Sequence, residues 1–178
     1  LGPVQNVIIG GSGAGDGNEI AGHLQSGISV ANTFSGIRIS GNSIHDNGAL
    51  GIDLITNMFE IGVTLNDPLD VDTGGNGLQN FPVLASAACT GSNTTVQGFL
   101  NSLANQAFTL EFFASPTCDS TGYGEGKTYL GATTVATNGV GDAAFSATLP
   151  VGATAGSVIT ATATQNATGN TSEFSACV

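Results

Sequence analysis

A run of acidic and amide side chains in residues 66–76 is the strongest candidate for chemistry in this sequence. Asp67, Asp70 and Asp72 supply carboxylates at close spacing. Asn76 adds an amide oxygen, and the glycines before it let the chain turn tightly. Since calcium takes about six to eight oxygen ligands of these kinds, the spacing predicts a calcium site, although two ligands of an EF-hand are missing. The alternative is a turn-rich connector whose carboxylates face water.

A second acidic turn lies in residues 10–16, which read Gly-Gly-Ser-Gly-Ala-Gly-Asp. The pattern is similar to the calcium repeat of β-rolls, but its aspartate, Asp16, comes one residue late and the motif occurs once. Because such sites are built between stacked turns, a single copy favours a flexible loop. No Lys follows the glycines, so the segment is not a phosphate loop either.

Catalytic side chains of the kind that β-helical polysaccharide lyases and hydrolases use are scarce. Such lyases need calcium and a base that abstracts a proton, and hydrolases need paired carboxylates. His45, Asp46 and Asp53 are the one group of histidine and carboxylates in the sequence. Since His45 and Asp46 are neighbours in a predicted turn, we expect their side chains to point apart and to face solvent. The sequence therefore predicts a protein that is not an enzyme.

The composition excludes several partners. Among 178 residues there are two Lys and Arg against 13 Asp and Glu, so the formal net charge is −11. A chain without a basic surface cannot neutralise phosphates, which excludes nucleic acid and disfavours anionic membranes. No apolar run approaches the roughly 18–20 residues that span a bilayer, so we expect no membrane insertion. With neither an initiating Met nor a signal peptide, we expect a processed part of a longer protein.

An internal repeat indicates how the first part of the chain is built. Residues 42–54 repeat residues 18–30 at an offset of 24, with Asn, Ile, Gly and Ile recurring in place. A fixed period of this length is typical of stacked supersecondary units. Short apolar runs that end at Gly or Asn predict a parallel β-helix over residues 1–65, in which Ile stacks on Ile and Asn18 stacks on Asn42. The alternative is an antiparallel meander with a chance repeat.

The pattern changes after a connector at residues 66–82, whose Asn, Asp, Gly and Pro residues favour turns. Residues 83–178 alternate polar and apolar side chains in longer runs, which predict an immunoglobulin-like β-sandwich. The Trp that marks true immunoglobulin domains is absent, so the prediction rests on the number of strands. Seven strands are expected, at residues 83–88, 94–100, 107–113, 128–135, 143–148, 157–164 and 172–177.

Three cysteines, Cys89, Cys118 and Cys177, match no zinc-binding spacing. In a secreted chain they predict one disulfide and one free thiol. The third and the last strands of the predicted sandwich end at the same pole, which favours a bond between Cys118 and Cys177. The first strand brings Cys89 to that pole too, so Cys89–Cys177 is the alternative pairing, and three reduced cysteines are a further one.

Several motifs carry a resemblance that covers nearly the whole chain. In the first part they are Asn42-Ser43-Ile44, Asn47-Gly48 and Gly51-Ile52-Asp53-Leu54, followed by the connector and Leu78-Gln79-Asn80-Phe81-Pro82-Val83-Leu84. In the second part they are Leu110-Glu111-Phe112-Phe113, Gly122-Tyr123-Gly124-Glu125-Gly126, Ile159-Thr160-Ala161-Thr162-Ala163-Thr164 and Gly169-Asn170-Thr171-Ser172-Glu173-Phe174-Ser175. Together they resemble the C-terminal region of secreted bacterial surface proteins with a right-handed parallel β-helix, those with a CSLREA-type segment among them. The resemblance implies an all-β fold, an extracellular location and no assigned chemistry. One departure is that only two to three rungs are predicted here, fewer than such proteins usually have.

These features predict a non-catalytic structural protein of the cell surface, either a filament subunit or a segment of a large adhesin. The end of a solenoid exposes unpaired strand edges, so its expected partners are copies of itself or upstream β-helix rungs. The first alternative is a calcium-dependent glycan-binding module, for which Tyr123 and Tyr129 beside a Gly-rich loop could present aromatic rings. A fragment of a polysaccharide lyase or hydrolase is the second alternative.

Overall fold

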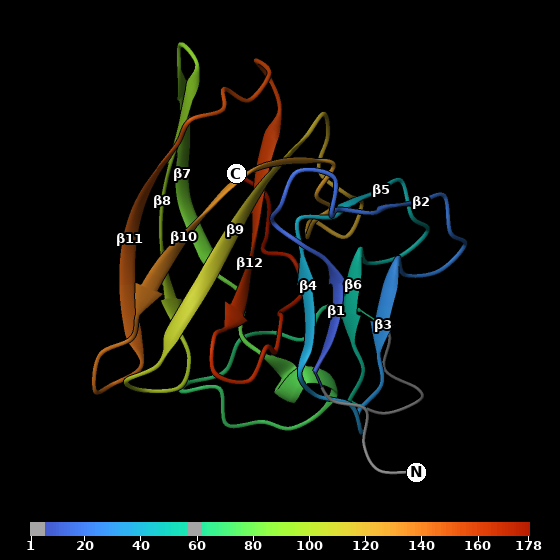
Figure 1. Ribbon diagram of the computed structural model, residues 1–178, viewed down its shortest axis with the longest axis vertical. Helices are drawn as coiled ribbons and strands as arrows, with labels where there is room; N and C mark the ends of the chain where they lie inside the picture. Colours follow the sequence, from blue (N-terminus) through green and yellow to red (C-terminus); the bar gives the residue numbers. More distant parts are fainter. Residues whose placement is uncertain (1–5, 57–61) are drawn as a thin grey trace.

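The computed structural model describes residues 6–56 and 62–178, and the fold is all-β (Figure 1). Short strands that pair in parallel lie on one side of the molecule, and long antiparallel strands lie on the other. Within the described residues, no helix has the length and apolar character that crossing a bilayer requires.

The first six strands are β1 (Val7–Gly10), β2 (Glu19–Ala21), β3 (Ile28–Val30), β4 (Ile37–Ser40), β5 (Ser43–His45) and β6 (Ile52–Leu54). They pair in parallel as β1–β4, β2–β5 and β3–β6, which gives three two-stranded sheets. We call β1, β2 and β3 the first layer, and β4, β5 and β6 the second layer. Because the pairing is parallel, the antiparallel meander is wrong for this repeat.

The 24-residue repeat sets the register of two of these sheets. It places isoleucines opposite each other, Ile20 with Ile44 and Ile28 with Ile52. The predicted stack of asparagines is confirmed, since Asn18 Nδ2 donates to Asn42 Oδ1 at 2.9 Å. The pair β1–β4 departs from the period, because Val7 lies opposite Ile37. The extra chain length is taken up by residues 11–18, a largely exposed loop between β1 and β2.

The two layers bury their inward side chains to different extents. In the second layer these residues are buried in one apolar cluster: Ile37, Ile39, Ile44, Ile52 and Leu54. In the first layer Val30 is buried in the same cluster, whereas the other inward side chains pack against it and are only partly buried: Val7, Ile9, Ile20 and Ile28. The outward side chain of Ile8 in β1 is 65% exposed. The second layer therefore lies inside the protein, and most of the first layer lies at its surface.

The antiparallel part consists of β7 (Val83–Thr90), β8 (Asn93–Asn101), β9 (Ala107–Ser115), β10 (Thr128–Ala136), β11 (Asp142–Leu149) and β12 (Val158–Gln165). They form two three-stranded sheets in the orders β11-β8-β7 and β10-β9-β12. One apolar cluster joins the sheets, with Val96 and Leu149 from the first and Phe112 and Ile159 from the second. The two sheets therefore pack face to face as a β-sandwich.

The prediction of a seventh strand at residues 172–177 is wrong. This segment runs beside β12, but hydroxyls replace backbone carbonyls as acceptors, from Ala163 N to Ser172 Oγ (2.9 Å) and from Ala161 N to Ser175 Oγ (3.0 Å). Residues 171–175 are all buried, whereas successive side chains of a strand point to opposite faces. Because the segment leaves strand geometry, the neighbouring side chains of Glu173 and Phe174 both reach the second layer.

The connector at residues 66–82 contains one short 3-10 turn, η1 (Gly75–Leu78), where the sequence predicts no regular element. Asp70 and Asn76 adopt positive φ values of 57° and 50°, a left-handed conformation that side chains other than Gly rarely take. These turns send the two side chains in different directions. Asp70 faces Ser102 at the end of β8, and Asn76 faces β4.

Candidate functional site

The edge of the second layer that faces away from the first layer meets the sandwich and the connector. In a parallel strand the backbone groups of alternate residues point to opposite neighbours, so this edge carries N–H groups that the first layer does not bond. Five of them donate to side-chain oxygens: Ile37 N to Asn76 Oδ1 (3.0 Å), Ile39 N to Thr171 Oγ1 (3.0 Å), Gly41 N to Glu111 Oε2 (2.9 Å), Asn47 N to Glu125 Oε2 (3.1 Å) and Leu54 N to Glu173 Oε1 (2.9 Å). We call these five side chains the acceptor row.

Asn76 acts on β4 as a neighbouring strand would. Its Oδ1 accepts from Ile37 N, while its Nδ2 donates to Ile37 O at 2.7 Å and to Thr171 O at 3.0 Å. The side chain is fully buried, and these bonds occupy both its donor and its acceptor. The structure therefore separates Asn76 from the aspartates with which its spacing groups it as a calcium ligand.

The three glutamates of the acceptor row are buried, and none forms an ion pair within the described residues. Burial raises the pKa of Glu111, Glu125 and Glu173, and it brings the pKa of Glu173 to about 8. Backbone N–H donors oppose the shift because they favour the ionised carboxylate, and Glu173 accepts a second such bond from Thr64 N at 2.8 Å. These buried carboxyls depend on the N–H groups of the second layer, so the two parts of the molecule stabilise each other.

Asp53 of β6 is a further buried carboxyl next to this edge, and its charge raises the pKa of Glu173. Ser26 Oγ donates to Asp53 Oδ2 at 2.9 Å, whereas Oδ1 is buried with no hydrogen-bond partner among the described residues. Burial raises the pKa of Asp53. Asp53 in β6 bonds Ser26, whereas His45 at the end of β5 bonds Asp46, and the three residues do not form a cluster of possible metal ligands.

The expectation that His45 and Asp46 point apart is wrong. His45 Nδ1 and Asp46 Oδ2 lie 2.7 Å apart, and Lys127 Nζ lies 3.6 Å from the same oxygen. Asp46 adopts a left-handed φ of 56°, which bends the chain directly after β5 and brings the two side chains to one side. The hydrogen bond from His45, and then the charge of Lys127, lower the pKa of Asp46.

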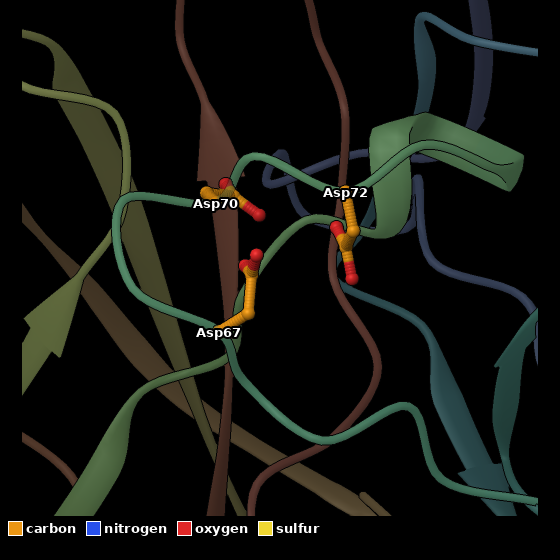
Figure 2. A group of neighbouring side chains, drawn as sticks. All are labelled: Asp67, Asp70 and Asp72. Carbon is orange, nitrogen blue, oxygen red and sulfur yellow. The ribbon is translucent and has the colours of Figure 1, made fainter.

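Asp67, Asp70 and Asp72 come together in the connector, and Figure 2 shows their carboxylates pointing toward one another. One oxygen from each lies within 4.8 Å of the other two. Asp67 Oδ1 and Asp72 Oδ1 are buried and lack a hydrogen-bond partner among the described residues. We call these three residues the aspartate cluster. Three of the four calcium ligands that the spacing predicts thus lie together.

Neighbouring side chains hold Asp70 in place. Its carboxylate accepts from Asn80 N at 3.0 Å, from Gln79 Nε2 at 2.8 Å and from Ser102 Oγ. Spacing in the sequence did not link these three residues to the aspartates. One feature of the sequence could have indicated these partners: the polar pair Gln79-Asn80 lies between the apolar residues Leu78 and Phe81. Ser102 lies in the loop after β8 and could not be linked to the cluster by spacing.

The electrostatics of the aspartate cluster favour a cation. Burial, aided by the charges of Asp72 and Asp67, raises the pKa of Asp70 to about 6, although hydrogen bonds from Ser102 and Asn80 oppose it. Burial and the charge of Asp67 also raise the pKa of Asp72. A hard divalent cation would relieve this repulsion and use the two unbonded oxygens, so the residues fit calcium by donor type. The described residues contain no other comparable group of three His, Cys, Asp or Glu side chains.

Cys118 and Cys177 form a disulfide, so the favoured pairing is confirmed. Cys89 is a free and exposed thiol, and the alternative pairing is therefore wrong. The bond ties the loop after β9 to the segment after β12 across a sequence separation of 59. A closure of that length stabilises the folded chain by about 4 kcal/mol, through the entropy that the unfolded chain loses.

Comparison of the chain with models of known protein families gives no match, and comparison with curated protein sequences gives none either.

Proposed function

We propose that this protein is a non-catalytic structural segment of an extracellular surface protein. In this proposal a short right-handed parallel β-helix at residues 1–65 is closed at one end by an immunoglobulin-like β-sandwich at residues 83–178. The acceptor row is the observation that carries it, because its side chains bond the strand edge that a further helix turn would otherwise bond. The two layers would then be the last turns of the helix.

Two further features support this assignment. An unbonded strand edge invites association with other chains, so a solenoid needs a cap at its end, and side-chain acceptors are a way to provide one. The sheet orders β11-β8-β7 and β10-β9-β12 also agree with the arrangement of strands in immunoglobulin-like sandwiches. The cap would therefore be a common type of β-sandwich whose last segment has been adapted to hold a β-helix.

The acceptor row also limits how the protein could assemble. It bonds the outer edge of the second layer, so among the described residues the first layer is the one whose outer strand edge is open to a partner. Two copies could pair through their first layers, but stacking of this kind closes on itself and cannot extend into a fibre. We therefore favour a segment of a large adhesin, with upstream β-helix rungs as the partner of the first layer, over a filament built by end stacking.

Amide hydrogen exchange measured by NMR tests the proposed cap. We expect the amides of Ile37, Ile39 and Leu54, which donate to the acceptor row, to exchange as slowly as those of the sandwich core. The amides of Ile8 and Ser29 should exchange fast, since the register points them away from the second layer. Equally fast exchange in both sets would show that the sandwich does not close the helix.

We also propose that the aspartate cluster binds one calcium ion. Asp67 and Asp72 would offer their unbonded oxygens, and Asp70 would be held in position by its hydrogen bonds to the sandwich side of the connector. The ion would then fix the connector against the end of β8. Titration calorimetry with calcium chloride tests this directly, and heat that persists in Asp72→Asn would contradict it.

An extracellular location is the third element of the proposal. Disulfides persist in oxidising compartments, and the Cys118–Cys177 bond is compatible with one. With Arg38 and Lys127 as its only basic residues, the chain offers trypsin-like proteases two cleavage points. Mass spectrometry of unreduced native material should recover the two cysteine peptides joined, and recovery of free thiols at both positions would argue against this location.

A further inference from the structure

A polar cleft of about 250 Å³ opens between the loop at residues 115–127 and the turn that follows β5. Its lining combines carboxyl, hydroxyl, imidazole and ammonium groups, among them His45, Asp46, Thr117, Ser120, Glu125 and Lys127. The second layer supplies the first two of these residues and the sandwich supplies the others. The cleft therefore exists only when the sandwich is packed on the second layer.

The charged groups of the cleft already have partners, and one of them, Asp119, accepts from Thr121 N at 2.8 Å. Asp46 Oδ2 lies 2.7 Å from His45 Nδ1 and 3.6 Å from Lys127 Nζ. Glu125 accepts from Asn47 N at 3.1 Å and from Asn47 Nδ2 at 2.7 Å. The side chain of Asp46 is nevertheless 76% exposed, so it keeps accepting capacity toward the solvent. A neutral ligand could hydrogen-bond to these groups without having to replace a charge.

The loop that forms one wall is held by covalent and hydrogen bonds. The disulfide fixes Cys118 to Cys177, and Gly124 N donates to Ser175 O at 3.1 Å. Within the loop, Asp119 N donates to Gly124 O at 3.1 Å. A wall that is ordered before binding removes much of the entropic cost of forming a complex.

Three properties of the cleft select one class of ligand. The net charge of −11 repels anions such as phosphates and uronic acids. The lining contains no Phe, Tyr or Trp side chain, which argues against flat aromatic ligands. Carboxylate acceptors on Asp46 and Asp119 share the lining with donors on Lys127, Thr117 and Ser120, and such a mixed set can bond neighbouring hydroxyls on a sugar ring.

We infer that this cleft binds a single neutral sugar residue of a glycan. Glycan recognition would then be a second function of a protein whose first function is structural. The inference does not depend on calcium, because none of the aspartate cluster lines the cleft. It also differs from the expectation that Tyr123 and Tyr129 present aromatic rings to a sugar, because neither tyrosine lines the cleft.

The test is an NMR titration of ¹⁵N-labelled protein with the methyl α-glycosides of glucose, galactose, mannose and N-acetylglucosamine. We expect at least one of them to shift the amide signals of Thr117, Ser120 and Lys127. Asp46→Asn and Lys127→Gln should each weaken its affinity by about tenfold, since both remove a charged hydrogen-bonding group. Asp142→Asn is the matched control, because Asp142 is an exposed carboxyl at the start of β11 and does not line the cleft.

Opening the disulfide provides a second readout. The double variant Cys118→Ser and Cys177→Ser should bind the same glycoside more weakly while the amide signals of β8 and β9 stay in place. The inference is overturned if none of the glycosides shifts the three amides, or if Asp142→Asn weakens binding as much as Asp46→Asn. It is also overturned if glucosamine binds and every neutral glycoside fails, since the cleft would then be a cation site.

Discussion

The first and second layers of parallel strands are built from one repeat, yet they differ in what covers them. Ile20 and Ile44 lie opposite each other in register, but Ile44 is 1% exposed whereas Ile20 is only partly buried. The same contrast holds at the strand edges. The second layer donates to the acceptor row, while the outer edge of the first layer has no such neighbour among the described residues.

The repeat specifies which strands pair, but the burial of their side chains depends on the segments that pack against them. The inward side chains of the second layer are covered by Phe113 and Phe174, whose rings meet edge to face with centroids 5.4 Å apart. Neither ring belongs to the repeat. A turn of parallel strands therefore gains most of its stability from its neighbours, as is typical of solenoids.

The largest effect should come from shortening the isoleucine at the same repeat position in each layer to alanine. We expect Ile44→Ala to lower the free energy of unfolding by about 3–4 kcal/mol, because it leaves a cavity among buried groups. Ile20→Ala, its partner in register, should lower it by about 1 kcal/mol, since its side chain is already partly solvated. Urea unfolding of both variants measures the difference, and equal losses would break the distinction between the layers.

The next effect concerns the edge bonds. Asn76→Ala should lower the free energy of unfolding by about 2–3 kcal/mol, because it leaves the N–H and C=O of Ile37 buried without partners. The control is Asn32→Ala, which removes an exposed amide that donates to Thr56 O, and it should change stability by no more than about 0.5 kcal/mol. If the two variants unfold at the same urea concentration, Asn76 is not replacing a strand.

Calcium binding should stabilise the side of the second layer that Asn76 bonds, because the aspartate cluster lies in the connector that leads to Asn76. Free calcium at about 100 times its dissociation constant should stabilise the wild-type protein by about 2.7 kcal/mol. Thermal unfolding with calcium chloride and with a chelator measures this shift. Asp72→Asn should abolish it and Asp142→Asn should keep it, and a shift of the same size in both would place the ion elsewhere.

A last effect is a dependence of stability on pH at the acceptor row. Burial raises the pKa of Glu173 to about 8 in the folded protein, so the unfolded chain loses this proton first as the pH rises. Its contribution to stability is therefore complete below the ordinary pKa and is lost as the pH rises to about 8.

Glu173→Gln should flatten this fall, because its amide does not titrate. Glu19→Gln, a change at an exposed glutamate of the first layer, should leave the pH profile of the wild-type protein as it is. Urea unfolding at several pH values between 5 and 8 measures the slopes. A profile that is flattened by Glu19→Gln and not by Glu173→Gln would contradict the assignment to Glu173.

Local pattern was enough to predict part of this fold. The repeat predicts that Ile20 pairs with Ile44, and alternation predicts the six strands of the sandwich, because both depend on neighbouring residues. The pairing of Val7 with Ile37 breaks the period, since a loop is inserted in the first layer and not in the second. Such an insertion cannot be found from the repeat itself.

The candidate sites were predictable only where their residues are close in sequence. Asp67, Asp70 and Asp72 share one segment, so their grouping follows from spacing. Asn76 does not join them because its left-handed backbone turns its amide to β4. The acceptor row could not be predicted, because its members come from the connector and from several segments of the sandwich, and what unites them is a strand edge that exists only after folding.

The position of Thr171 and Glu173 has a consequence for the order of events during synthesis. Their bonds join residues 132 and 119 positions apart, so the strands they complete are made long before their partners. High contact order of this kind slows folding, and the bonds to Ile39 N and Leu54 N can form only after Thr171 and Glu173 have been synthesised. Arg38 lies in β4, and cleavage there by trypsin reports whether that strand is protected. A chain of residues 1–165 should be cut at Arg38 and a chain of residues 1–178 should resist, so the segment after β12 decides when β4 becomes protected.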